Sequence, residues 1–125
     1  MFNPEMDVLV VDDASAIRRI VRALLKELGF KNIRDAENGQ LALEELKKKK
    51  ADFVVCDWNL PVMTGIDLLR AIRADDALKS VPVLMVTAKD KQEHIIEAVK
   101  AGVSHNIVKP FNAQTLQEKL SKIFP

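Results

Sequence analysis

Short apolar runs alternate with helical patterns along all 125 residues of the chain, and this order limits the possible folds more than any other feature. Residues 8–11, 53–56 and 83–86 are apolar without interruption, which is typical of strands buried on both faces, and weaker strand patterns lie at 33–36 and 104–108. Strands that alternate with helices need crossover connections. We therefore expect an α/β fold, in which five helices cover both faces of a doubly wound, mostly parallel five-stranded sheet.

Helical spacing and capping residues predict where the helices lie. After the first strand, apolar residues recur at helical spacing at Ile17, Ile20, Val21, Leu24, Leu25 and Leu28. Gly29 and Gly102 stand where helices would end. The expected N-caps are, in chain order, Asn38, Thr64 in a capping-box variant with Asp67, Asp90 and Asn112. The helix after Asp90 is expected to carry Ile95, Ile96 and Val99. The three most apolar runs should form the central strands, with the two mixed strands at the edges.

Length and charge exclude several classes of protein. A chain of 125 residues, 48% of them hydrophobic, is long enough for one domain with a core and too short for two, so we expect residues 1–125 to form a single domain with no output domain. The formal net charge of +1 favours neither nucleic acid nor an acidic membrane as a partner. The chain carries no signal peptide or apolar run of membrane-spanning length, and its single cysteine, Cys56, fits a reducing compartment. We expect a soluble cytoplasmic protein.

Polar side chains stand at the ends of the predicted strands. They are Asp12 and Asp13 after the first strand, Asp57 after the third, Thr87 after the fourth and Lys109 after the fifth. Parallel strands bring their carboxyl ends to one edge of the sheet, so these side chains should converge there. Three neighbouring carboxylates would repel one another unless a cation shared the site, and oxygen ligands suit Mg²⁺ better than Zn²⁺.

These residues form a chemically interpretable set. The Asp57 carboxylate could act as a nucleophile on a phosphoryl group and form an acyl phosphate. A metal ion would neutralise charge on the phosphoryl oxygens, while the Lys109 ammonium group and the Thr87 hydroxyl group would hold them. The two histidines, His94 and His105, follow no strand end, and we expect both to be surface or edge residues.

Four motifs carry a resemblance to a known family. They are Val-Val-Asp-Asp at 10–13, Asp-Trp-Asn-Leu-Pro at 57–61 with Met63 and Gly65, Val-Thr-Ala at 86–88, and Val-Lys-Pro-Phe at 108–111. With these motifs the chain resembles the receiver domains of two-component response regulators, and among them the single-domain chemotaxis regulators of the CheY type. The resemblance implies a flavodoxin-like fold with strand order 2-1-3-4-5, and Mg²⁺-dependent phosphorylation of Asp57 by a histidine kinase.

The resemblance also implies roles for individual residues. Asp13, Asp57 and the backbone carbonyl group of Asn59 would bind the metal ion, with Asp12 acting mainly through water. Thr87 and Lys109 would contact the phosphoryl group, and the peptide bond between Lys109 and Pro110 is often cis in this family. Such a protein is not an enzyme in the usual sense, since at most it catalyses its own phosphorylation and dephosphorylation.

One position departs from the family pattern. Asn106 stands where chemotaxis regulators usually carry an aromatic switch residue, and the chain has no tyrosine. The partners implied are a CheA-like histidine kinase and a flagellar motor switch protein or a phosphatase, with the chain itself a monomer. The output face would include, by analogy, Asp90, Lys91, Ile95, Val103, Asn106, Asn112 and Lys119. Phosphorylation at Asp57 is better supported than binding to the motor.

Three functions are compatible with these residues. The first is a phosphorylation-switched binding module, and the second is a phosphate sink or relay receiver, which the loss of the aromatic residue favours. The third is a metal-dependent phosphatase, but Asn59 cannot supply the acid/base carboxylate that such hydrolases place two residues after the nucleophile. A nucleotide or flavin site is not supported, because the four glycines form no phosphate-binding loop.

Overall fold

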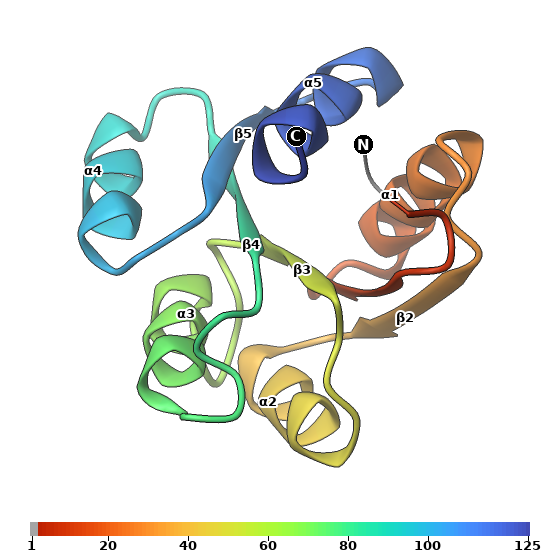
Figure 1. Cartoon of the computed structure of the whole chain (residues 1–125). Helices are drawn as coiled ribbons and strands as arrows, with labels where there is room; N and C mark the ends of the chain where they lie inside the picture. The colour runs from red at the N-terminus through yellow and green to blue at the C-terminus, as the bar shows by residue number, and fades with distance from the viewer. Residues whose placement is uncertain (1–2) are drawn as a thin grey trace.

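A computed structural model describes residues 3–125 as one α/β unit (Figure 1). In chain order the elements are β1 (Asp7–Val11), α1 (Ser15–Glu27), β2 (Asn32–Ala36), α2 (Gly39–Lys48), β3 (Phe53–Asp57), α3 (Gly65–Ala74), β4 (Val83–Ala88), α4 (Gln92–Lys100), β5 (His105–Lys109) and α5 (Ala113–Ile123). All neighbouring strands are parallel, in the order β2-β1-β3-β4-β5. The predicted five-stranded α/β fold and its strand order are confirmed.

The sheet separates two apolar core clusters. On one face α2, α3 and α4 contribute Leu46, Leu69 and Ala98, and on the other α1 and α5 contribute Leu25 and Leu116. The central strands β1, β3 and β4 are buried almost throughout, whereas the edge strands β2 and β5 are largely exposed or half-buried. The sequence predicted this division, because only a strand covered on both faces is uniformly apolar.

Most of the predicted helix ends are confirmed. The side chains of Asn38 and Asn112 accept backbone hydrogen bonds from Leu41 and Thr115 at 2.8 and 2.9 Å. The Thr64 hydroxyl accepts the amide hydrogen of Asp67 at 3.3 Å. After α1, Gly29 takes a positive φ of 104°, which a residue with a side chain rarely adopts.

The start of α4 differs from the prediction. Lys91, rather than Asp90, occupies the N-cap position, and it makes no side-chain cap hydrogen bond. Ile96 and Val99 are 59% and 65% exposed, and the buried residue of this helix is Ala98. Helix α4 thus joins the core cluster through a small residue, and two of its larger apolar residues are mostly exposed.

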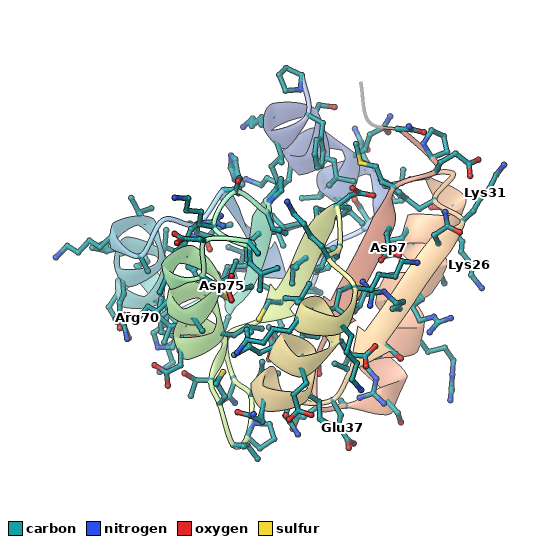
Figure 2. The ribbon with its side chains drawn as sticks, turned by 60° about the horizontal axis from the view of Figure 1, so that its bottom comes forward. Asp7, Lys26, Lys31, Glu37, Arg70 and Asp75 are labelled. Atoms are coloured by element: carbon teal, nitrogen blue, oxygen red, sulfur yellow. The ribbon has the colours of Figure 1, made fainter. Side chains whose placement is uncertain are left out.

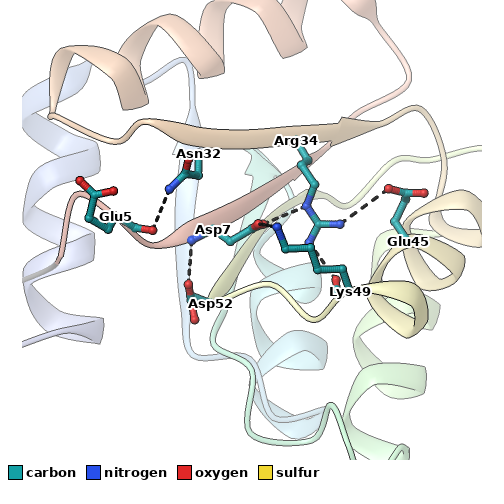
Figure 3. Close-up of polar contacts among 7 residues, drawn as sticks. All are labelled: Glu5, Asp7, Asn32, Arg34, Glu45, Lys49 and Asp52. Atoms are coloured by element: carbon teal, nitrogen blue, oxygen red, sulfur yellow. Dashed lines mark hydrogen bonds and ion pairs between the residues drawn. The ribbon is translucent and has the colours of Figure 1, made fainter.

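Charged side chains at the amino end of β1 join neighbouring segments of the fold. Arg34 on β2 bonds to Asp7 on β1 at 2.9 Å and to the carbonyl oxygen of Lys49 at 2.8 Å, as Figure 3 shows. The Asp52 carboxylate accepts the amide hydrogen of Asp7 at 2.7 Å. These contacts tie β1 to β2 and to the segment that enters β3.

Both ends of the described chain pack against the same core. Met6, just before β1, and Phe124, just after α5, contact the cluster between the sheet and helices α1 and α5. The Phe124 ring meets the Phe53 ring edge-on, with centroids 5.6 Å apart.

Cys56 is buried, as expected of a small apolar residue. Within residues 3–125 no helix is both long enough and apolar enough to cross a membrane.

Candidate functional site

Four strands deliver polar side chains to the carboxyl edge of the sheet. Asp57 ends β3, Thr87 lies near the end of β4, and Lys109 ends β5, while Asp12 directly follows β1. The strand register places Thr87 opposite Val108, next to Lys109. Asp57 is 4% exposed and Thr87 fully buried. The parallel topology therefore brings together the residues that the strand ends singled out.

The Asp57 carboxylate is held on both of its oxygens. Its Oδ1 accepts a hydrogen bond from Lys109 Nζ at 3.0 Å, and its Oδ2 accepts one from the Asn59 amide at 3.2 Å. The peptide bond after Lys109 is cis. The loop that follows Asp57 returns close to it, since a Cβ atom on Gly65 would collide with the Asp57 carbonyl oxygen. The carboxylate is thus buried and fixed in orientation.

Asp12 lies in an electrostatically unfavourable position. Burial raises the pKa of this carboxyl group, and the charges of Asp57 and Asp13 raise it further. The hydrogen bond from the Ala14 amide and the charge of Lys109 oppose the shift. That bond measures 2.9 Å to Asp12 Oδ1. Asp13 is exposed. A cation at this edge would relieve the repulsion that raises the Asp12 pKa.

The three aspartates do not form a closed metal cage. Within residues 3–125, no group of three or more His, Cys, Asp or Glu side chains is arranged to hold a metal ion. The Lys109 ammonium group already contacts one oxygen of Asp57. The donors fit an ion that takes one or two carboxylates and completes its shell with water and backbone oxygen atoms, which is the habit of Mg²⁺ in proteins.

Two buried oxygen atoms near the site have no hydrogen-bond partner. They are Thr87 Oγ1 and Asn106 Oδ1, from neighbouring strands β4 and β5. A buried hydroxyl group without a partner is costly, so such atoms often mark a place that a ligand completes. Thr87 Oγ1 is therefore a donor without a partner, on the residue that follows Val86, the register partner of Asp57.

Sequence reasoning missed one residue at this edge, His94. Its imidazole ring stacks on the Trp58 indole ring with centroids 4.0 Å apart and an interplanar angle of 7°. Both rings line a cavity of ≈ 360 Å³ that Asp57, Asn59 and Lys109 also line. The sequence did hold a signal for His94. A helix that follows β4 must begin at the carboxyl edge of the sheet, and His94 lies in the first turn of that helix. His105, by contrast, lies on edge strand β5 as expected.

A second, largely apolar cavity of ≈ 350 Å³ lies on the α1 side of the same edge. Ile17, Ile20 and Phe111 line it together with Asp57 and Lys109. The helical pattern predicted Ile17 and Ile20 to face the core, yet they are 40% and 54% exposed. Both residues line this cavity between α1 and the loop before α5.

Comparisons with known proteins agree along the whole chain. Residues 8–121 match the model of the response regulator receiver domain. The chain is 59% identical over 124 residues to chemotaxis protein CheY-3 of Vibrio cholerae, covering 99% of this chain and 95% of that protein. It is 57% identical over 119 residues to chemotaxis protein CheY of Pseudomonas aeruginosa, covering 95% and 96%.

Solved structures give the same result. The chemotaxis response regulator CheY4 of Vibrio cholerae superposes with a TM-score of 0.87 at 34% identity, over 96% of this chain and 99% of that one. A response regulator from Chloroflexus aurantiacus gives a TM-score of 0.90 at 29% identity, over 95% and 97%. On this combination of fold, motifs and similarity, the chain belongs to the family of response regulator receiver domains.

Proposed function

We propose that this chain is a chemotaxis response regulator that accepts a phosphoryl group on Asp57 from a CheA-like histidine kinase. The observation that carries the proposal is the buried Asp57 carboxylate, held by Lys109 at 3.0 Å and by the Asn59 amide, with the unpartnered Thr87 hydroxyl nearby. The chemotaxis role is supported by the two CheY relatives, which are more than half identical to this chain.

The transfer step needs only one nucleophile from this chain. A carboxylate oxygen of Asp57 forms a bond to phosphorus as the bond between phosphorus and the donor nitrogen of a phosphohistidine breaks. The electron pair of that bond stays with the imidazole ring of the donor, which takes up a proton. Lys109 and Thr87 donate hydrogen bonds to the phosphoryl oxygens, where charge develops. No separate acid/base carboxylate is required, so the protein is a phosphoacceptor rather than an enzyme.

The proposal includes a Mg²⁺ ion bound at the carboxyl edge of the sheet, beside Asp12, Asp13 and Asp57. Asp13, Asp57 and the backbone carbonyl group of Asn59 would hold it, with Asp12 acting through water. When bound, it supplies charge neutralisation at the phosphoryl oxygens. The raised pKa of Asp12 supports this assignment, because burial and, to a smaller extent, the charges of Asp57 and Asp13 disfavour the Asp12 carboxylate, which a shared cation would stabilise.

The output is a noncovalent interaction through α4, β5 and α5. Ile96 and Val99 on α4 and Val108 on β5 are exposed apolar residues that a partner could cover. In this proposal residues 1–125 form one receiver domain that works as a monomer, and its partners are a flagellar motor switch protein or a phosphatase.

A second candidate function is a phosphate sink or relay receiver that does not bind the motor. The observation that favours it is Asn106, whose half-buried side chain leaves its Oδ1 atom without a hydrogen bond beside β4. The Asn106 amide cannot fill the space that the aromatic switch residue of chemotaxis regulators would occupy. Phosphorylation would then proceed without a strong change in partner affinity.

The test is intact-protein mass spectrometry after incubation with phosphoramidate and Mg²⁺, for the wild type, Asp57→Asn and Asp76→Asn. Asp76 is a matched control, since its side chain is 99% exposed and lies far from the site in the chain. We expect the mass of one phosphoryl group on the wild type and on Asp76→Asn, and none on Asp57→Asn. An adduct on Asp57→Asn would refute the assignment.

Binding of a flagellar switch peptide then separates the two functions. Stronger binding by the phosphorylated protein supports a motor-directed switch. Unchanged binding, with a normal adduct on Asp57, supports the sink or relay.

A further inference from the structure

Helix α4 is weakly fixed at its amino end. Its N-cap residue, Lys91, makes no side-chain cap hydrogen bond. Its buried residue, Ala98, lies in the carboxyl-terminal half, while Ile96 and Val99 are mostly exposed. The first turns of the helix therefore depend on other contacts for their position.

His94 provides such a contact, and it leads directly to the phosphoacceptor. The imidazole ring lies parallel to the Trp58 indole ring at a centroid separation of 4.0 Å. Trp58 follows Asp57 in the chain, and its backbone is held on both sides. Its amide donates to the Val86 carbonyl oxygen at 3.0 Å, and its own carbonyl oxygen accepts from Gly65 at 2.9 Å. The ring on which His94 rests is therefore carried by the same loop that contains Asp57 and Asn59.

A second polar side-chain contact of α4 is an ion pair with α3. Arg70 on α3, labelled in Figure 2, pairs with Glu97 at 2.7 Å. Both side chains are about half exposed, at 52% and 43%, so solvent screens the pair. This ion pair joins α4 to α3 and does not touch the loop that follows Asp57. It offers a matched control for the ring contact.

We propose that the stack of His94 on Trp58 couples the phosphorylation loop to the position of α4, with His94 as a positioning residue. Through it, a change at Asp57 reaches the exposed side chains of Ile96 and Val99. This inference rests on the proposed function in one respect: the change that starts the movement of α4 is the proposed phosphorylation of Asp57. The contact between the His94 and Trp58 rings would link the loop after Asp57 to α4. It would do so in a chain that has asparagine, not an aromatic residue, at position 106.

Packed elements respond to such a change by shifting between discrete arrangements, because closely packed contacts do not deform continuously. The coupling is also reciprocal: whatever holds α4 in one arrangement favours the matching arrangement of the loop. The ring contact therefore acts in both directions, from the site to α4 and from α4 to the site.

The first experiment compares the wild type, His94→Ala, His94→Phe and Glu97→Gln without any ligand. Hydrogen exchange by NMR reports on amides 94–97, and acrylamide quenching reports on the accessibility of Trp58. We expect exchange about two- to ten-fold faster in His94→Ala, the range expected for loss of one aromatic stack, together with stronger quenching. His94→Phe should restore both, since it keeps a flat ring. Glu97→Gln should leave the quenching of Trp58 unchanged.

The second experiment adds beryllofluoride with Mg²⁺, as a mimic of the phosphoryl group, to the same four proteins. We expect the exchange of α4 amides to respond in the wild type, His94→Phe and Glu97→Gln, and to respond much less in His94→Ala. Equal responses in His94→Ala and the wild type would overturn the coupling.

Failure of the proposed function gives a different result from failure of the coupling. If the wild type forms no phosphoryl adduct, the proposed function fails. The ligand-free comparison still decides on the ring contact: exchange in His94→Ala equal to that of the wild type overturns the inference.

Discussion

Lys109 Nζ lies 3.0 Å from Asp57 Oδ1, which joins the last residues of β5 and β3 across the end of β4. The carboxylate is nearly buried, whereas the lysine side chain is 44% exposed. The lysine thus reaches inward from the rim to the buried acceptor. In the proposed reaction, Lys109 would release one oxygen atom of Asp57 and donate its hydrogen bond to the phosphoryl group instead.

Lys109→Gln should slow phosphoryl uptake on the order of 100-fold, the loss found when one donor to a developing negative charge is removed. Lys91→Gln is the control, because Lys91 lines the same cavity and the Asp57 hydrogen bonds involve Lys109 and Asn59 instead. The rate of adduct formation by intact mass measures the effect. Equal rates in the two variants would mean that Lys109 has no role in transfer.

Asp12→Asn should be more stable than the wild type at neutral pH. The pKa of Asp12 is raised in the folded protein, chiefly by burial, so ionisation costs stability. The stability that protonation provides is fully present below the ordinary pKa of 3.8 and is lost as the pH rises through the raised value. Asparagine escapes this loss and can still accept the Ala14 hydrogen bond.

Urea unfolding from pH 7 down to pH 4 measures this difference. The advantage of Asp12→Asn should shrink as the pH falls. Asp76→Asn removes the same charge at a 99% exposed position and should show little dependence on pH. An advantage of Asp12→Asn that grew towards acid pH would contradict the sign of the pKa shift.

Titration with Mg²⁺ should change the emission of Trp58, which is the only tryptophan in a chain without tyrosine. The ring directly follows Asp57, so an ion bound at the carboxylates alters its surroundings. Asp13→Ala should move the midpoint to higher Mg²⁺ concentration, and Asp76→Ala should not. A flat wild-type titration in the millimolar range would argue against the metal assignment.

Val62→Asn should stabilise the fold by about 1 kcal/mol, because a β-branched residue with positive φ is strained. Val62 has a φ of 67° and is 83% exposed, so little packing is lost on substitution. Val99→Asn is the control, since Val99 is 65% exposed but helical. Unfolding by urea should show a gain for the first variant only.

Arg73→Ala should destabilise the protein by about 2 to 3 kcal/mol, since it removes charged hydrogen bonds to partly buried acceptors. The guanidinium group donates to the carbonyl oxygens of Val81 at 2.6 Å and Gly102 at 2.8 Å. Burial lowers the pKa of Arg73. Arg70→Ala, which breaks an exposed ion pair, should cost less than about 1 kcal/mol. Equal losses would show that the Arg73 contacts add nothing.

The fold could be predicted because its signals are local and repeated. Each buried strand is continuously apolar, each helix shows its own spacing, and parallel connections leave few arrangements. The parallel arrangement also predicted that Asp57, Thr87 and Lys109 lie at one edge of the sheet, because all three stand at strand ends. The roles given to these residues remain predictions for the experiments above.

Contacts set by the packing of one element on another could not be predicted. The stack of His94 on Trp58 depends on how α4 sits over the sheet, and spacing along the helix does not determine that position. The sequence placed Ile96 and Val99 on α4 without showing which side of the helix is buried, and the helix packs through Ala98. The hydrogen bond of Arg73 to Gly102 spans 29 residues. Each of these contacts depends on side-chain geometry between distant segments.

The packing of Met6 and Phe124 against one core cluster has a practical consequence for handling the molecule. Strand β1 starts, and α5 finishes, at the amino edge of the sheet, whereas Asp57 stands at the carboxyl edge (Figure 1). A tether, fluorophore or fusion attached after α5 therefore keeps clear of Asp57. Molecules immobilised through the carboxyl end would leave the Asp57 edge facing the solution, which suits single-molecule assays of the proposed phosphorylation.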